Sequence, residues 1–140
     1  MATNFTEIGN KDGFDHVVQL AGTAAATAAN YGFLITASRA FELIKIKVRY
    51  SAASSSGTLQ LERLTGTTAL GSGTTVLTTP ISLSATANTT YEFDVTNFVR
   101  NTNQLRENES FALVDGGLLV GLTDLSLTFY FFPQGKGEYT

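Results

Sequence analysis

The chain has 140 residues, a formal net charge of −3 and no cysteine. This length suits a single domain with a sizeable buried core. The acidic balance argues against nucleic-acid binding, which needs a basic surface to displace counterions, and the lack of cysteine excludes disulfides and thiolate metal sites. Charged residues make up only 15% of the chain. Much of the polar surface must therefore be Thr, Ser and Asn, which suits burial against other protein better than a solvated enzyme face.

Membrane insertion and secretion find no support in the sequence. No apolar run reaches the roughly 18 residues that a membrane span needs. The first residues, MATNFT, lack the basic start and apolar core of a signal peptide. We therefore expect a soluble protein made in the cytoplasm, with no membrane partner.

The first half of the chain predicts an arm followed by strands. Residues 1–13 are polar and predict an N-terminal arm. Strands are predicted at 14–20, 31–37 and 41–52, and the last of these has the cleanest alternation. The alanine-rich segment 22–30 is short and lies between strand signals, so an extended or loop conformation is favoured over a helix.

The middle of the chain predicts a hairpin and two short strands. We expect strand 58–64 to pair back on strand 41–52 across a serine-rich turn. Short strands at 74–78 and 81–84 are separated by Pro80, which cannot donate to a ladder and fits an edge or a bend.

In the last third, residues 91–96 alternate, which predicts Tyr91, Phe93 and Val95 inward and Glu92 and Asp94 outward. Residues 97–108 are the one segment that suits a helical turn, with Asn97 as its cap and Phe98, Val99 and Leu105 facing the core.

Three further strands are predicted at 111–114, 118–122 and 125–132. A C-terminal tail, 133–140, follows the last of them.

Many short strands at intervals of about 8–12 residues indicate an all-β, single-domain antiparallel β-sandwich, jelly-roll-like, with at most one or two short helical turns. The predicted sandwich spans residues 14–132. Its expected inward set is Ile44, Ile46, Val48, Leu59, Leu61, Phe93, Val95, Leu113, Leu125, Leu127 and Phe129.

A basic row lies on the predicted strand 41–52. Alternation places Lys45, Lys47 and Arg49 on one face, opposite Ile46 and Val48. Two interpretations remain open: a solvated outer face, or a docking stripe for an acidic partner surface.

The end of the last predicted strand is apolar on both faces, at Phe129, Tyr130, Phe131 and Phe132. Such a strand end is covered on both sides, either by the chain's own arm or by another subunit, and exposed apolar patches usually mark interfaces. We favour another subunit and expect a homotrimer, with a dimer as the second choice.

Catalytic and metal-binding patterns are weak. His16 is the only histidine and has no second histidine or thiolate for zinc. Glu92 and Asp94 share one face of a strand, which favours solvent or a subunit contact over general acid–base work. Asp12 and Asp15 match no calcium loop. We therefore predict no enzyme activity, no metal and no cofactor.

Two phrases carry a resemblance to a known group of proteins. Residues 59–73 read LQLERLTGTTALGSG, and residues 110–119 read SFALVDGGLL, followed by a final alternating strand. This pattern resembles small structural proteins of tailed bacteriophage virions, cyanophages included. These are β-sandwich proteins that decorate or cement the capsid, or that belong to head fibres and tails. The resemblance covers residues 41–130 and includes no catalytic signature.

The resemblance implies a virion protein, made in the host cytoplasm, that binds the major capsid protein on the capsid surface. The expected contact elements are the arm, the tail and the basic row. The alternative is a fibre, tail or receptor-binding jelly-roll module that recognises carbohydrate. Its aromatic platform would come from Tyr31, Tyr50, Tyr91 or Tyr139, although the chain has no tryptophan.

Overall fold

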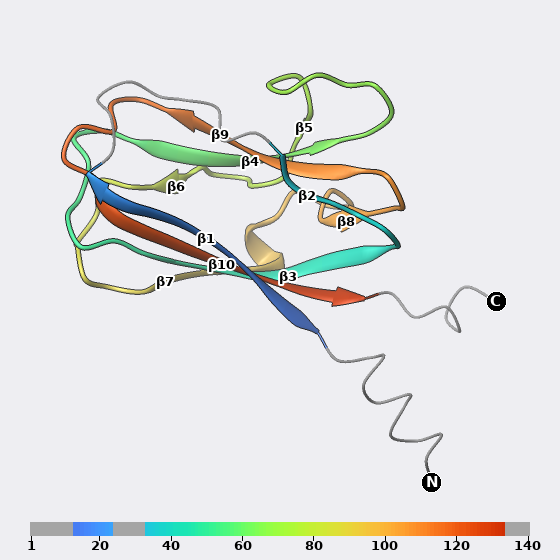
Figure 1. Cartoon of the computed structure of the whole chain (residues 1–140), viewed down its shortest axis with the longest axis horizontal. Helices are drawn as coiled ribbons and strands as arrows, with labels where there is room; N and C mark the ends of the chain where they lie inside the picture. Colours follow the sequence, from blue (N-terminus) through green and yellow to red (C-terminus); the bar gives the residue numbers. More distant parts are fainter. Residues whose placement is uncertain (1–12, 24–32, 134–140) are drawn as a thin grey trace, which may run out of the picture.

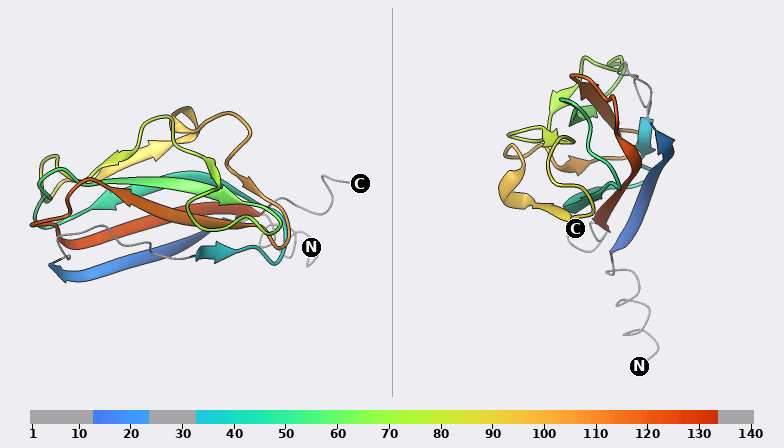
Figure 2. Two further views of the ribbon diagram at one scale, coloured as in Figure 1. Left: turned by 90° about the horizontal axis from the view of Figure 1, so that it is seen from above. Right: turned by 90° about the vertical axis from the view of Figure 1, so that its left-hand side faces the viewer.

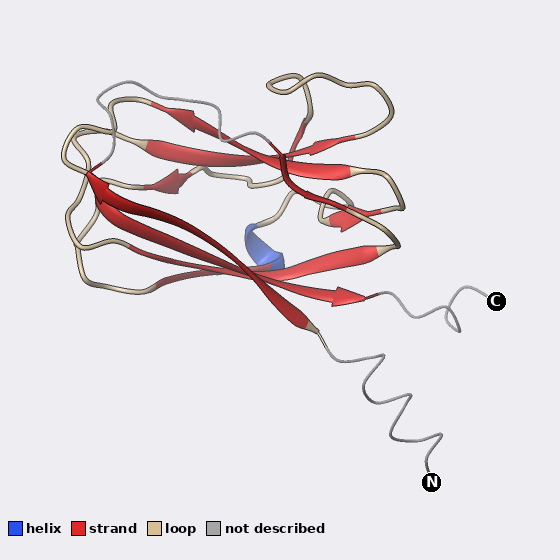
Figure 3. Ribbon diagram, in the orientation of Figure 1, coloured by secondary structure: helices blue, strands red, loops and turns tan. Residues whose placement is uncertain are grey.

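The computed structural model describes residues 13–23 and 33–133. In this part of the chain, ten strands form two antiparallel sheets that pack face to face (Figures 1 and 3). A single 3-10 turn in the same part of the chain lies outside the sheets. The predicted all-β sandwich is confirmed, with one short helical turn. No helix among these residues is long and apolar enough to cross a membrane.

Each sheet has five strands. Sheet A has the order β1 (Phe14–Thr23), β10 (Thr123–Pro133), β3 (Phe41–Arg49) and β7 (Tyr91–Asp94), and β8 (Gln104–Leu105) pairs with the other end of β3. Sheet B has the order β2 (Phe33–Thr36), β9 (Ser110–Gly116), β4 (Thr58–Leu64) and β5 (Thr74–Thr75), and β6 (Ile81–Ser82) pairs with the other end of β4.

The connectivity is that of a jelly roll. The first four strands alternate between the sheets, and the last two insert between them: β10 lies between β1 and β3, and β9 lies between β2 and β4. Figure 2 shows the two layers from above and from one end.

The hairpin predicted between 41–52 and 58–64 is wrong. β3 belongs to sheet A and β4 to sheet B, so residues 50–57 cross from one layer to the other. Within this crossing, the Ser55 N–H donates to the Val120 carbonyl at 2.9 Å, so the segment contacts the β9–β10 loop. A serine-rich turn indicates a reversal of the chain, but it does not indicate whether the chain returns to the same sheet.

A β-bulge shifts the faces of β3. Lys45 pairs with Tyr130, whereas Leu43 pairs with Phe131, so Ile44 is an extra residue on β3. Leu43 is consequently fully buried and Ile44 only half-buried. The prediction that Ile44 points inward is therefore replaced by Leu43.

Val95 also departs from the predicted alternation. The strand ends at Asp94, and the 3-10 turn η1 (Val95–Asn97) leaves Val95 largely exposed. Asp94 caps this turn by accepting from Thr96, whereas Asn97, the predicted cap, accepts from the Asp94 N–H. The other predicted inward positions are buried or, at Phe93, half-buried: Ile46, Val48, Leu59, Leu61, Leu113, Leu125, Leu127 and Phe129.

Residues 118–122 form a loop and not the predicted strand. Gly117 and Gly121 both have positive φ, which breaks an extended conformation. Leu119 and Leu122 are nevertheless buried, so their side chains anchor the loop to the core.

Both ends of the described sandwich lie side by side. Phe14 of β1 pairs with Phe131 of β10, so the chain enters and leaves at the same end of sheet A (Figure 1). β10 extends to Pro133, one residue beyond the predicted boundary. Apart from Gly13 and Pro133, the predicted arm 1–13 and tail 133–140 lie outside the described residues. So does most of segment 22–30, whose first residues, to Thr23, end β1.

Candidate functional site

The outer face of sheet A is built from three rows of side chains that cross its strands. In an antiparallel sheet, residues directly opposite each other share a face. The register gives a first row of Asp15, Tyr130, Lys45 and Asp94, a second row of Val17, Thr128, Lys47 and Glu92, and a third row of Gln19, Ser126 and Arg49. Arg49 extends the third row by a 3.2 Å hydrogen bond to the Thr90 hydroxyl. We refer to these residues as the outer face.

The basic row is paired with carboxylates of the same chain. The ammonium groups of Lys45 and Lys47 each lie 3.8 Å from the same Glu92 oxygen. Because these side chains are half-exposed, each ion pair contributes little to stability. The structure brings Lys45 and Lys47 together with Glu92, which is distant in the sequence. The basic row is thus solvent-exposed and partly neutralised, and its role as a docking stripe stays a prediction.

The charges of the outer face cancel. Lys45, Lys47 and Arg49 occupy β3, and the carboxylates of Asp15 and of Glu92 and Asp94 lie on either side of them. The face therefore offers both charged donors and charged acceptors rather than one sign of charge.

Asp94 is held in its ionised form. The Thr96 hydroxyl donates to its carboxylate at 2.6 Å and the Thr96 N–H at 2.9 Å. These bonds, aided by the charge of Lys45, hold the pKa of Asp94 below its usual value. The negative end of the first row is thus present at neutral pH.

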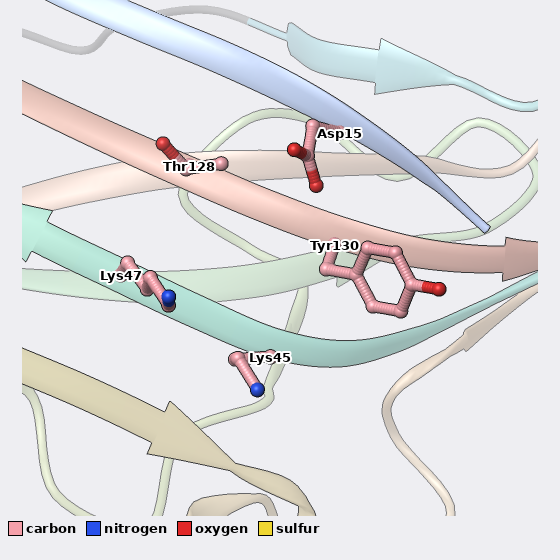
Figure 4. Close-up of a pocket in the computed structure, with 5 residues that line it drawn as sticks. All are labelled: Asp15, Lys45, Lys47, Thr128 and Tyr130. Atoms are coloured by element: carbon pink, nitrogen blue, oxygen red, sulfur yellow. The ribbon is translucent and has the colours of Figure 1, made fainter.

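A groove follows β10 across the outer face. Ser126 and Thr128 have short side chains, and the longer side chains of β1 and β3 rise beside them. One cavity of about 210 Å³ is lined by Asp15, Lys45, Lys47, Thr128 and Tyr130 (Figure 4). A second, of about 220 Å³, is lined by Lys47, Val48, Arg49, Thr90, Ser126 and Thr128. The two share Lys47 and Thr128, so they are parts of one open groove.

Tyr130 closes one end of the groove. Its ring lies directly against Gly13, where a Cβ atom would overlap the ring. Glycine at this position therefore lets the aromatic side chain pack over the start of β1, as tyrosine often does beside a strand glycine.

The predicted interface residues separate into two sets. Phe129 and Phe131 are fully buried, and the Phe131 ring packs near those of Phe111, Phe129 and Phe14. These two phenylalanines fill the chain's own core and present no surface to another subunit, which corrects that part of the interface hypothesis. Tyr130 and Phe132 point to the outer side of sheet A, and Phe132 is 38% exposed. Of the four aromatic residues, only this pair remains available for an interface.

The tyrosines proposed as a carbohydrate platform have structural roles where they are described. Tyr50 is buried, its hydroxyl accepts from the Ala85 N–H at 3.0 Å, and burial raises its pKa. Tyr91 stacks on Tyr50 and donates its hydroxyl to the Thr86 carbonyl. Tyr31 and Tyr139 lie outside the described residues. Tyr130, which sequence reasoning did not consider for this role, is the tyrosine that lines the groove.

A second exposed apolar feature lies on the β9–β10 loop. Leu118 and Val120 are about half exposed, although their backbone is held firmly: the Leu118 carbonyl accepts from the Ser56 N–H, and the Leu118 N–H donates to the Ser56 hydroxyl. The sequence phrase around Gly116 and Gly117 gave no sign that the following leucine faces solvent.

Metal binding has no assembled site in the part of the chain that the structure describes. No group of three His, Cys, Asp or Glu side chains comes together there. His16 lies on β1, half-buried and opposite Phe129. Asp15 lies in the groove, and Asp12, its predicted companion, is outside the described residues.

No protein-family model matches the chain, and no curated protein matches it. Among solved structures, Bacillus endospore appendages, described as disulfide-linked pili, align over 89% of this chain and 91% of theirs, at 14% identity and a TM-score of 0.42. The EclA C-terminal domain, described as a sugar-binding protein, aligns over 81% of this chain and 74% of its own, at 12% identity and a TM-score of 0.41.

The infectious bursal disease virus Gx strain structure aligns over 90% of this chain and 31% of its own, at 15% identity and a TM-score of 0.27. This chain therefore spans about a third of that viral protein. At these TM-scores the similarities assign neither a family nor a function.

Proposed function

We propose that this protein is a structural virion protein that binds the outside of a phage capsid and stabilises it, with the major capsid protein as its partner. The resemblance of residues 41–130 to phage decoration proteins supplies the class. The observation that carries the proposal is the outer face, a broad sheet surface on which a line of three cations on β3 has carboxylates on both sides, Asp15 on β1 and Glu92 and Asp94 on β7. Such a pattern suits a protein partner whose charges are arranged in the complementary way, because charge complementarity fixes register and excludes wrong partners.

The position of the chain ends supports the same role. Residues 1–12 and 134–140 attach at the end of sheet A where Tyr130 and Phe132 lie. Two segments and an aromatic pair at one end can thus engage the same neighbouring capsid subunit.

Stabilisation would follow from mass action. A protein that binds the assembled shell and not its separated subunits stabilises the shell by an amount set by its affinity and occupancy, about 2.7 kcal/mol per site at a hundredfold excess over Kd. No bond needs to be made or broken, so the proposed role requires no catalytic group.

The test compares complete particles with particles that lack this protein. We expect the depleted particles to release their genome at a lower temperature, and added purified protein to restore the original temperature. The double variant Lys45→Glu/Lys47→Glu should raise the release temperature less, because it places negative charges on β3 beside the negative charge of Glu92. Arg100→Glu/Arg106→Glu, which makes the same change of net charge at two exposed residues that are not part of the outer face, is the matched control. Equal stability of depleted and complete particles, together with lost host adsorption, would reject the cementing role.

The groove supports a second candidate function, carbohydrate recognition by a fibre or tail module. Tyr130, Asp15 and Thr128 line one cavity (Figure 4). Together they supply an apolar ring surface, a hydrogen-bond acceptor and a hydrogen-bond donor. Glycan binding that Tyr130→Ala abolishes and Phe132→Ala preserves would favour this candidate. Absence of binding to host surface glycans would remove it.

A further inference from the structure

β1 differs from the other strands at the sheet edges. Sheet B ends in β2, of four residues, on one side and in β5 and β6, of two residues each, on the other. The edge of sheet A beyond β3 is divided between β7, of four residues, and β8, of two. β1 has ten residues and ends the other side of sheet A. Proteins usually keep edge strands short because a long edge is a template for further pairing.

β1 has few of the other features that protect an edge. It has one register irregularity, between Leu20 and Thr23 and so beyond the segment from Asp15 to Gln19, and Asp15 is its only carboxylate. Its sequence FDHVVQLAGT contains no proline, lysine or arginine. One side of β1 pairs with β10, and no second strand among the described residues pairs with its other side.

An exposed valine lies at the centre of this strand. Val17 is 51% exposed, more than any other large hydrophobic side chain on a described strand. It stands on the outer face, between Asp15 and Gln19, which are also exposed. Within residues 13–23 and 33–133, the strand therefore combines a backbone edge that pairs with no further strand and apolar surface on its flank.

We propose that β1 pairs antiparallel with β1 of a second copy of the chain. The two copies are related by a two-fold axis that is perpendicular to the sheet and lies midway between Val17 and Val17 of the second copy. Directly opposite residues in an antiparallel pair point to the same face of the sheet. The axis must therefore place a residue opposite its own copy, because sequence neighbours point to opposite faces. Centred on Val17, the register places Val17 against Val17 of the second copy and Asp15 against its Gln19.

This register is self-complementary. The two valines cover each other, each carboxylate faces an amide, and no like charges lie opposite one another. The same strand edge serves both copies, as a closed two-fold interface requires. The β1 edge is therefore suited to pairing with a second copy of this chain.

The pairing has a consequence for the outer face. A two-fold axis perpendicular to the sheet places both outer faces on the same side of one continuous sheet. The dimer would present two copies of the row Lys45, Lys47 and Arg49 to a single surface. The dimer does not depend on the proposed capsid role, and its test uses the purified chain alone.

Cross-linking tests the register. The chain contains no cysteine, so each variant carries a single thiol. Under mild oxidation, Val17→Cys should form a covalent dimer at least about tenfold faster than Val120→Cys, a position of similar exposure on the β9–β10 loop. Opposite Cβ atoms lie about 4.5–5.5 Å apart, close to disulfide geometry.

A mixing experiment distinguishes this register from any other. Asp15→Cys mixed with Gln19→Cys should cross-link to each other. Neither should cross-link with itself, because each thiol is then offset from its twin by four residues, about 14 Å. Equal rates for self and mixed pairs would overturn the register.

Charge insertion tests the assembly. Val17→Lys places two ammonium groups opposite each other and should raise the dimer dissociation constant at least about tenfold in sedimentation velocity. Val95→Lys, at a similarly exposed position off the sheet edge, should leave it unchanged. A monomer at concentrations up to about 100 μM would overturn the proposal. A trimer, the state expected from the sequence, would overturn it as well. If Val17→Lys fails to fold, the Asp15→Cys and Gln19→Cys mixture decides.

Discussion

The Glu62 carboxylate accepts a hydrogen bond from the Gly71 N–H at 2.7 Å, and its other oxygen accepts from the Gly73 N–H at 3.1 Å. Glu62 is almost fully buried, and these bonds hold the β4–β5 loop against sheet B. Gly71 has a φ of +87°, and a Cβ on Gly73 would lie 2.6 Å from the Arg63 carbonyl oxygen. The segment LQLERLTGTTALGSG therefore forms a strand and the loop after it, and Glu62 of the strand holds this loop in place by hydrogen bonds.

Removing this carboxylate should destabilise the fold. Glu62→Ala leaves two backbone donors without their acceptor, and we expect the free energy of unfolding to fall by about 2–3 kcal/mol in urea titrations. Glu92→Ala, on the exposed outer face, should change it by less than about 1 kcal/mol. Equal losses for the two variants would contradict this role of Glu62.

Two glycines with similar φ separate backbone strain from steric overlap. Gly66 has a φ of +58° with nothing near its missing Cβ, whereas Gly117 has a φ of +69° and a Cβ there would overlap the Ser56 carbonyl. We expect Gly66→Ala to cost about 1 kcal/mol, from the left-handed conformation alone. Gly117→Ala should cost at least about 2 kcal/mol more, because the crossing segment must move. Thermal unfolding of both variants measures the difference.

Adjacent phenylalanines at the end of β10 should respond very differently to truncation. Phe131 is fully buried among aromatic rings, and Phe131→Ala should cost about 3–5 kcal/mol of stability. Phe132 is partly exposed on the opposite face, and Phe132→Ala should cost less than about 1 kcal/mol. Chemical denaturation of the purified chain checks both values. Similar losses would show that the faces of β10 are assigned wrongly.

Asp94 should make stability depend on acid pH. Its pKa in the folded chain lies below the usual value of 3.8, chiefly because the Thr96 hydroxyl and N–H bond the ionised form. The stabilisation that Asp94 contributes is present above about pH 4. It is lost as the pH falls through the pKa of Asp94 in the folded chain, because the unfolded chain binds the proton at a higher pH.

Two variants test this origin. Asp94→Asn should flatten the fall of the unfolding free energy below about pH 4. Thr96→Val removes the hydroxyl donor and should raise the pKa of Asp94 toward 3.8 in an NMR titration. An Asp94 pKa unchanged by Thr96→Val would contradict the assignment.

Local pattern alone determined much of the strand content and the outward direction of the basic row. Side chains alternate with a period of two, so Ile46 and Val48 on one face require Lys45, Lys47 and Arg49 on the other, whatever strand lies alongside. The same rule failed at Ile44, because the bulge that shifts β3 arises from its pairing with β10 and leaves no mark in the period.

Only the tertiary structure decided which strands are neighbours. The sequence placed β4 beside β3, but pairing with β9 places it in the other sheet. Other pairings between distant strands bring Lys47 to Glu92 and both ends of the sandwich to one end of sheet A. Periodicity reports which side of a strand is buried, whereas the identity of a neighbour depends on contacts between residues distant in the chain. The fold class was therefore readable from the sequence, and the charge-balanced surface was not.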